Sequence, residues 1–194
     1  AINSDMIQAD FNNMEFTSNE NKFSLKDLPL IGEHNFKNYL AAILAARLDD
    51  ISINDSIEYL KTFKGVKRRL ELVTETSKVK VYDDFAHHPT AINFSVCAMR
   101  KKYPNKKILG IVELGSNTMS SGHHKENLIN SFDLLDKTLL LDHKKVYEYQ
   151  YAYHKIESLL SNLKETIMDY DIIFIMTNKD SQKFIKPILE YIEK

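Results

Sequence analysis

Short apolar runs and longer amphipathic stretches alternate along the second half of the chain, and this alternation restricts the fold more than any other feature. Four runs have the length and composition of strands, and four stretches have apolar residues at helical spacing. The expected strands cover 79–84, 106–114, 137–141 and 171–176, and the expected helices cover 89–103, 125–136, 155–167 and 181–193. Strands that alternate with helices predict an α/β fold with an open, mostly parallel sheet and helices on both faces.

The loops that follow the predicted strands are the first places to look for a site. Right-handed crossovers bring every such loop to the same edge of a parallel sheet, and ligands of these folds bind at that edge. The loops are DDFAHHP at 83–89, ELGSNTMSSGHH at 113–124 and TNKDSQ at 177–182. All three are rich in polar side chains.

The first 64 residues have a different pattern. Alternating residues around SNEN predict a hairpin within 14–25, and apolar spacing predicts helices at 34–48 and 52–63. Ser52 or Asn54 is expected to cap the second helix, and Gly65 is expected to end it and start a strand. No initiator Met precedes Ala1, so we expect a piece of a longer protein.

The composition is that of a globular protein without a strong net charge. Hydrophobic residues make up 43% and charged residues 27%, and the formal net charge is -1. Such a charge gives no field that favours nucleic acid or a membrane surface, so neither is expected as a partner. The single cysteine, Cys97, excludes an internal disulfide and a multi-cysteine zinc site. A cytoplasmic location is therefore expected.

The stretch DDFAHHP concentrates carboxylates and imidazoles where a predicted strand gives way to a helix. In one interpretation an Asp or His caps the helix, Pro89 occupies its first turn, and the rest is solvated. In the other, the cluster faces a nucleotide or another anion. Adjacent side chains of a strand point in opposite directions, which disfavours a shared zinc ion, and no metal site is predicted.

Two further stretches carry side chains suited to a nucleotide. Asn35 can cap the helix at 34–48, but capping does not account for Asn38, which lies on the same face and is a poor helix-interior residue. Two amides on one face suit the donor and acceptor edge of adenine. An arginine of GVKRRLE at 65–71 is either a solvated charge or a fork for phosphate oxygens.

The motifs GEHNFKNYLAA, FKGVKRRLE and DDFAHHPTAI, in this order and spacing, resemble the Mur ligase family of ATP-dependent amino acid and peptide ligases. The resemblance implies a Rossmann-like C-terminal domain. The chain lacks GxxGK[ST], the phosphate loop expected in the central ATPase domain of the family. Residues 1–64 therefore resemble the C-terminal portion of the central ATP-binding domain, and residues 65–194 resemble the C-terminal domain.

Within the family, the SNTM of the 113–124 loop resembles the peptidoglycan-recycling branch. That branch joins UDP-N-acetylmuramate to L-alanyl-γ-D-glutamyl-meso-diaminopimelate, the murein tripeptide, through an acyl phosphate. The resemblance implies these two substrates, with ATP and Mg²⁺ held mainly by an upstream part, and an inactive fragment when that part is missing. The alternatives are the branch that adds L-alanine and, in a different class, a stand-alone Rossmann-like binding module.

The resemblance also implies roles for residues that contact the nucleotide. Asn38, with His34 and Asn35 near it, matches the adenine contact of the family. Arg69 matches the arginine that reaches ATP phosphate when the domains close. Asp84 matches the aspartate that contacts the nucleotide from the C-terminal domain.

Other roles concern the reaction and the acceptor. His87 matches a histidine near the reacting carboxyl group and the incoming amine, so Arg69 and His87 are the expected catalytic residues. Ser116, Asn117 and Thr118 lie in the loop implied to meet the acceptor peptide.

Three positions depart from the family pattern. Phe85 replaces a common tyrosine, and Gly115 stands where the recycling branch often has arginine. The stretch Thr177–Gln182 replaces a glycine-rich loop. These departures predict altered contacts at the carboxyl edge of the sheet.

Overall fold

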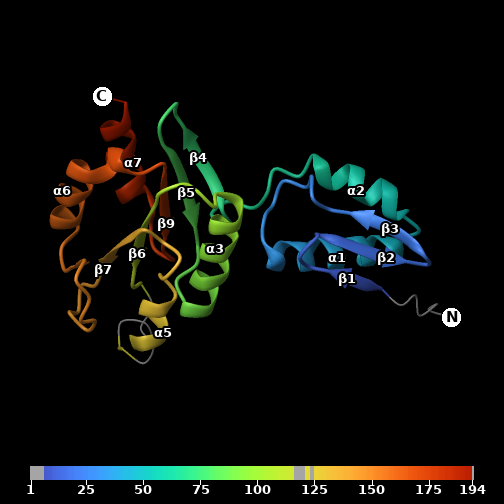
Figure 1. The fold of residues 1–194 in the computed structure, drawn as a ribbon, viewed down its shortest axis with the longest axis horizontal. Coiled ribbons are helices and arrows are strands. Elements are labelled where there is room, and N and C mark those ends of the chain that lie inside the picture. Colours follow the sequence, from blue (N-terminus) through green and yellow to red (C-terminus); the bar gives the residue numbers. More distant parts are fainter. Residues whose placement is uncertain (1–6, 116–120, 123–124, 194) are drawn as a thin grey trace. The chain divides into compact units, whose positions relative to one another are not determined.

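The computed structural model describes residues 7–115, 121–122 and 125–193. It divides into two compact units, Ala1–Gly65 and Val66–Lys194. The first ends at Gly65, whose φ of 86° lies in the left-handed region that glycine adopts at little cost. Each unit has a sheet and helices of its own (Figure 1).

The first unit is a three-stranded antiparallel sheet packed against helices. Its elements are β1 (Gln8–Asp10), β2 (Glu15–Ser18), β3 (Asn21–Ser24), α1 (Glu33–Arg47) and α2 (Ile53–Lys61). Phe16 of β2 and Phe36 of α1 lie in one buried cluster. The predicted hairpin and both helices are confirmed, and Ser52 caps α2 by accepting from the Asp55 N–H at 3.1 Å.

The second unit contains a six-stranded sheet in the order β4-β5-β9-β6-β7-β8. β4 is antiparallel to β5, and the other neighbours are parallel, which confirms the predicted α/β fold with a mostly parallel sheet. The strands are β4 (Glu71–Glu75), β5 (Lys80–Asp84), β6 (Ile108–Glu113), β7 (Lys137–Leu141), β8 (Ala152–Tyr153) and β9 (Ile172–Met176). The helices are α3 (Pro89–Lys102), α5 (Lys125–Asn130), α6 (Ile156–Thr166), the 3-10 turn η1 (Ile167–Asp169) and α7 (Gln182–Ile192).

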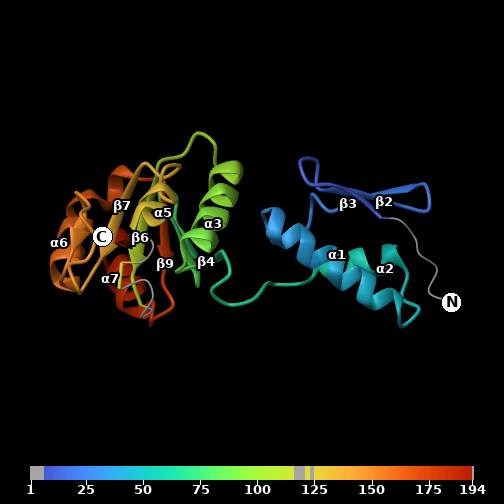
Figure 2. The same ribbon diagram turned by 90° about the horizontal axis from the view of Figure 1, so that it is seen from below.

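Helices cover both faces of this sheet. Val81 and Ile175 of the strands share a buried cluster with Leu163 of α6 and Phe184 of α7. α3 lies on the opposite face (Figure 2). β5 leads into α3 and the neighbouring β9 leads into α7, so the loops after these two strands diverge to opposite faces. Such a point in an open α/β sheet forms a crevice at the carboxyl ends of the strands.

Three local expectations are corrected. The helix expected at 125–136 ends at Asn130, where the Ser131 hydroxyl donates to the Leu128 carbonyl at 2.6 Å and the chain continues in turns. The strand expected from Gly65 begins only at Glu71. The short β8 was not expected, because two residues carry no periodic signal.

Candidate functional site

Polar side chains from three neighbouring strands meet at the carboxyl edge of the second unit's sheet. Asp83 and Asp84 end β5, Thr177 follows β9, and Glu113 ends β6, and all four are buried. β9 lies between β5 and β6, and the Thr177 N–H donates to the Asp84 carbonyl at 3.1 Å. The sheet order therefore joins the DDFAHHP loop to the TNKDSQ loop.

Asp84 braces the chain on both sides of β5. Its carboxylate accepts from the Leu70 N–H at 2.8 Å, the Ala86 N–H at 2.7 Å and the Ser95 hydroxyl at 3.2 Å. Burial raises the pKa of Asp84, although these hydrogen bonds act in the opposite direction. The carboxylate fixes the turn before β4 and the start of the loop before α3. Its predicted contact with nucleotide stays a prediction.

Asp83 points to the other face, toward α7. Its Oδ2 accepts from the Ser181 hydroxyl at 2.6 Å and lies 3.3 Å from Nε of Arg68. The Arg68 guanidinium also donates to the Thr177 carbonyl. Burial raises the pKa of Asp83, against the effects of Ser181 and Arg68. The opposite directions of Asp83 and Asp84 follow the strand alternation expected from the sequence.

Phe85 brings the two expected catalytic residues together. The Arg69 guanidinium lies 5.7 Å from the Phe85 ring centroid, and the His87 ring meets Phe85 edge-on with centroids 5.5 Å apart. Nδ1 of His87 is 3.0 Å from the Phe85 carbonyl oxygen. Arg69 lies between Arg68 and Leu70, which have left-handed φ angles of 58° and 49°. This turn presents an exposed Arg69 beside the half-buried His87.

A second charged cluster surrounds Glu113. Its Oε2 accepts from the Thr177 hydroxyl at 2.7 Å, and its Oε1 pairs with Nζ of Lys183 and lies 3.7 Å from Nε2 of His143. The side chain of Glu113 is only 4% exposed, so its charge is offset inside the protein. The loops that begin at Glu113 and Thr177 were expected at this edge, but the contacts of Glu113 with Thr177 and Lys183 depend on the sheet order.

The predicted adenine contacts lie in the first unit, at the start of α1. The Asn35 side chain is buried and donates to the Ile31 carbonyl at 2.8 Å. Its Oδ1 accepts from Nδ2 of Asn38 at 3.3 Å, which orients the exposed Asn38 amide. Asn35 does not cap the helix, since Gly32 occupies that position. His34 is half-buried beside them.

The remaining expected site residues lie outside the described part of the chain. Ser116, Asn117 and Thr118 fall in this category, so the structure describes only residues 113–115 and 121–122 of the acceptor loop. His88 caps α3, and its Nδ1 accepts from the Thr90 N–H at 3.4 Å. The capping interpretation of DDFAHHP is therefore correct for His88.

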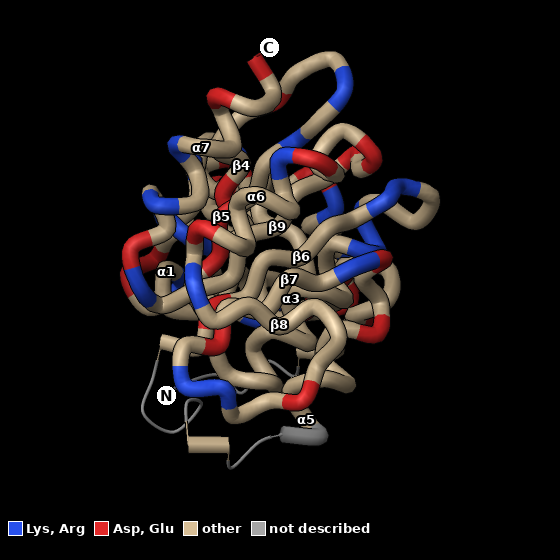
Figure 3. The backbone as a smooth tube through the Cα atoms, turned by 90° about the vertical axis from the view of Figure 1, so that its left-hand side faces the viewer, with Lys and Arg blue, Asp and Glu red and all other residues tan. Residues whose placement is uncertain are grey.

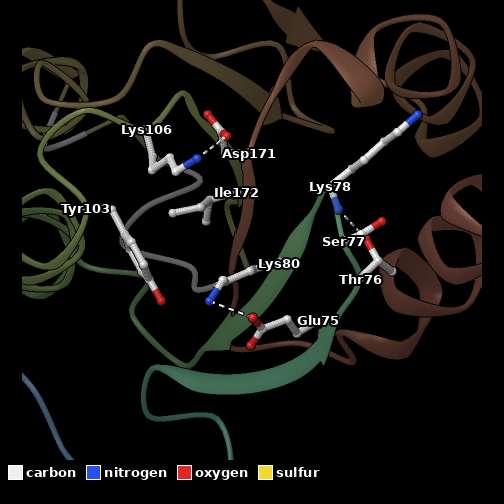
Figure 4. A pocket seen from close by; sticks show the side chains of 9 residues that line it. All are labelled: Glu75, Thr76, Ser77, Lys78, Lys80, Tyr103, Lys106, Asp171 and Ile172. Carbon is white, nitrogen blue, oxygen red and sulfur yellow. Dashed lines mark hydrogen bonds and ion pairs between the residues drawn. The ribbon is translucent and has the colours of Figure 1, made fainter.

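A cavity of about 220 Å³ opens at the opposite, amino-terminal edge of the same sheet. Figure 4 shows Lys80 extending to Glu75 and Lys106 extending to Asp171, and both ion pairs measure 2.8 Å. Tyr103 forms one wall of this cavity. Its charges are largely paired with one another, which makes the carboxyl edge the stronger candidate site.

The described residues also limit which partners and which kinds of site this part of the chain can have. Lys and Arg are interspersed with Asp and Glu in Figure 3, with no face of one sign in that view. Among these residues no group of three or more His, Cys, Asp or Glu side chains is placed to hold a metal ion. Within the same part of the chain, no helix has the length and apolar character needed to cross a membrane.

Comparison with known proteins shows the family. The sequence profile described as "Mur ligase, glutamate ligase domain" matches residues 68–168. The UDP-N-acetylmuramate–L-alanyl-γ-D-glutamyl-meso-2,6-diaminoheptandioate ligase of Escherichia coli strain K12 is 44% identical over 113 residues, which are 58% of this chain and 25% of that protein. The UDP-N-acetylmuramate–L-alanine ligase of Leuconostoc mesenteroides is 36% identical over 114 residues, with the same two coverages.

A solved structure extends the likeness to the first unit. The murein peptide ligase of Psychrobacter arcticus is 27% identical, with a TM-score of 0.64, and the match covers 99% of this chain and 43% of that one. The two curated ligases named above are much longer than this chain, which spans about a quarter of their length. The profile covers more than half of the chain, and the fold agrees with it. The chain belongs to the Mur ligase family.

Proposed function

We propose that this chain is part of an ATP-dependent ligase that joins UDP-N-acetylmuramate to the murein tripeptide through an acyl phosphate, in peptidoglycan recycling. The observation that carries the proposal is the identity with a ligase named for this tripeptide, which exceeds that with the relative named for L-alanine. The cluster of Arg69, His87 and the two aspartates at the carboxyl edge supports it with a site of suitable chemistry.

The two compact units have different proposed roles. Residues 1–64 form the end of the central ATP-binding domain, and residues 65–194 form the C-terminal domain. The phosphate loop, the UDP-sugar site and most ligands of Mg²⁺ belong to an upstream part of a longer, cytoplasmic protein. Mg²⁺, when bound there, neutralises phosphate charge.

In the first unit, Asn38 offers an exposed side-chain amide to the adenine edge. Asn35 holds that amide in place, because its own side chain is anchored to the Ile31 carbonyl. A base that presents one donor and one acceptor is matched by such an amide. His34 lies next to this pair and completes the proposed adenine contact.

In the second unit, Arg69 places a guanidinium on the phosphate that carries developing charge. The turn that holds it is fixed at both ends, by the Asp84 contact with the Leu70 N–H and by the Phe85 N–H donating to the Arg68 carbonyl at 2.8 Å. A cation that is already in position costs little reorganisation during reaction. Asp84 contacts the nucleotide side of the site.

His87 acts at the reacting carboxyl group and the incoming amine. Its Nδ1 lies against the Phe85 carbonyl, so the other ring nitrogen is the one available to substrate. The ring orients the amine or the tetrahedral intermediate by hydrogen bonding. Ser116, Asn117 and Thr118 are proposed to meet the acceptor peptide.

The test is ligation by the full-length protein. Purified protein is incubated with ATP, Mg²⁺, UDP-N-acetylmuramate and either the tripeptide or L-alanine, and the product is identified by mass. We expect ATP-dependent addition of the tripeptide. Addition of L-alanine alone moves the protein to the other branch of the family, and ligation of neither acceptor refutes the proposal.

A further inference from the structure

The loop Thr177–Gln182 is anchored at both ends to the carboxyl edge of the sheet. Thr177 is tied to Glu113 and to the Asp84 carbonyl, and Ser181 is tied to Asp83. Within the loop, the Lys179 N–H donates to the Thr177 hydroxyl at 3.0 Å. The backbone that carries Lys179 is therefore held by contacts to two strands.

This loop lies directly against Gly115. A Cβ atom at position 115 would lie 2.0 Å from Oδ1 of Asn178, 2.7 Å from Cγ of Lys179 and 3.0 Å from Cε of Lys179. The side chains of Asn178 and Lys179 thus occupy the space where any side chain at position 115 would begin. A positive charge next to position 115 therefore has to come from the Thr177–Gln182 loop, because a side chain at position 115 would not fit.

Lys179 differs from the other cations of this edge. Lys183 is paired with Glu113, and Arg68 is paired with Asp83. Among the described side chains, no Asp or Glu lies within ion-pair distance of Lys179, which is exposed. Its ammonium group is therefore free to meet an anion at the carboxyl edge of the sheet, next to Gly115.

We propose that Lys179 binds a carboxylate of the acceptor and helps to determine which acceptor the enzyme uses. This inference rests on the proposed function, in which the acceptor is a peptide with several carboxylates. An exposed lysine on an anchored backbone provides a point charge on a flexible stem, which can reach a carboxylate at the end of a peptide. The absence of a side chain at Gly115 leaves room for the lysine stem, because a Cβ there would lie 2.7 Å from Cγ and 3.0 Å from Cε of Lys179.

The experiment uses the full-length protein with Lys179→Met, which keeps the apolar stem and removes the charge, and Lys179→Arg, which keeps a charge. Lys78→Met, in the exposed turn between β4 and β5, is the matched control. Acceptors are the tripeptide and its three mono-amides, each with one carboxyl group amidated. KM and kcat are measured for acceptor, ATP and UDP-N-acetylmuramate.

We expect Lys179→Met to raise KM for the tripeptide about tenfold, as for one lost hydrogen bond to a charged group. Lys179→Arg retains most of the affinity, Lys78→Met changes nothing, and KM for ATP stays the same. For one mono-amide, the wild-type protein and Lys179→Met should have equal KM values, because the carboxylate that Lys179 binds is already neutral.

Three results overturn the inference while the wild-type protein ligates the tripeptide: an unchanged KM in Lys179→Met, a raised KM for ATP instead, or the same rise for all three mono-amides. If the wild-type protein uses L-alanine only, the proposed acceptor is wrong, and L-alaninamide replaces the mono-amides in the same comparison. Wild-type protein that ligates neither acceptor refutes the proposed function, and the inference with it.

Discussion

At the scale of single residues, the adjacent Asp83 and Asp84 stabilise different segments of the chain. Asp84 satisfies two backbone N–H groups and a serine hydroxyl on the α3 side, whereas Asp83 holds Arg68 and Ser181 on the α7 side. Both carboxylates are buried, so their contacts are part of the fold as well as of the site. Asp84 fixes the turn that carries Arg69, and Asp83 fixes the end of the loop before α7.

Asp84→Asn is expected to destabilise the second unit by about 2–3 kcal/mol. The amide NH₂ of asparagine would face the N–H of Leu70 or Ala86, which places a donor against a donor and removes one hydrogen bond. The measurement is urea unfolding of the 194-residue chain followed by tyrosine fluorescence. Eight of the ten tyrosines lie in Val66–Lys194, so this signal reports mainly on the second unit.

The control for this substitution is Asp133→Asn, an exposed position in the turns after α5. It should change the free energy of unfolding by less than about 0.5 kcal/mol. If Asp84→Asn is as mild as this control, the carboxylate does not brace the turn before β4.

At the scale of elements, the site depends on where strands end. β5, β9 and β6 end side by side, and their last residues or the first residue beyond them supply Asp83, Asp84, Thr177 and Glu113. The hydrogen bonds that link these ends join residues 64 to 98 positions apart in the chain. A buried carboxylate at a strand end also makes stability depend on pH.

Burial raises the pKa of Asp83 and Asp84 from the ordinary value of 3.8. The folded state therefore holds these protons more tightly than the unfolded state does. As pH rises from about 4 through the raised values, the free energy of unfolding should fall, because ionisation is easier in the unfolded chain. Unfolding in urea between pH 4 and 7 measures this slope.

Asp83→Asn should make that fall smaller, since one of the two groups no longer titrates. Glu190→Gln, on the exposed side of α7, should run parallel to the wild-type protein at every pH. A slope that is equal in Asp83→Asn and the wild-type protein would show that Asp83 does not contribute to the pH dependence.

At the scale of the whole molecule, the two compact units carry residues with different proposed roles. The amides expected to contact adenine are on α1 of the first unit, and the groups expected to meet phosphate and acceptor are on the second. The proposed reaction needs both units and an upstream part.

Arg69→Ala in the full-length protein is expected to lower kcat about 100-fold or more, as when a preorganised donor to developing charge is removed. The neighbouring Lys67→Ala, also exposed, is the control and should retain activity. The 194-residue chain alone should release no ADP. Arg69→Ala with unchanged kcat, or ADP release by the 194-residue chain with its small substrates, would contradict the proposed roles.

Much of the fold could be predicted from local patterns. The apolar runs of β5, β6, β7 and β9 and the spacing of α3, α6 and α7 identified these elements, because burial on a sheet or helix face imposes a short period on the sequence. Boundaries were less accurate where side chains compete with the backbone, as Ser131 does after α5. β8 was too short to leave a pattern.

Local patterns in the sequence were enough to predict the kinds of elements, the mostly parallel sheet and the family, since periodicity and motifs are local properties of the chain. The position of β9 between β5 and β6 became visible only in the folded chain, and with it the contacts of Thr177 with Glu113 and of Ser181 with Asp83. The same is true of the contact between Lys179 and Gly115. These contacts join segments far apart in the chain, and no short-range pattern encodes which strand ends will be neighbours.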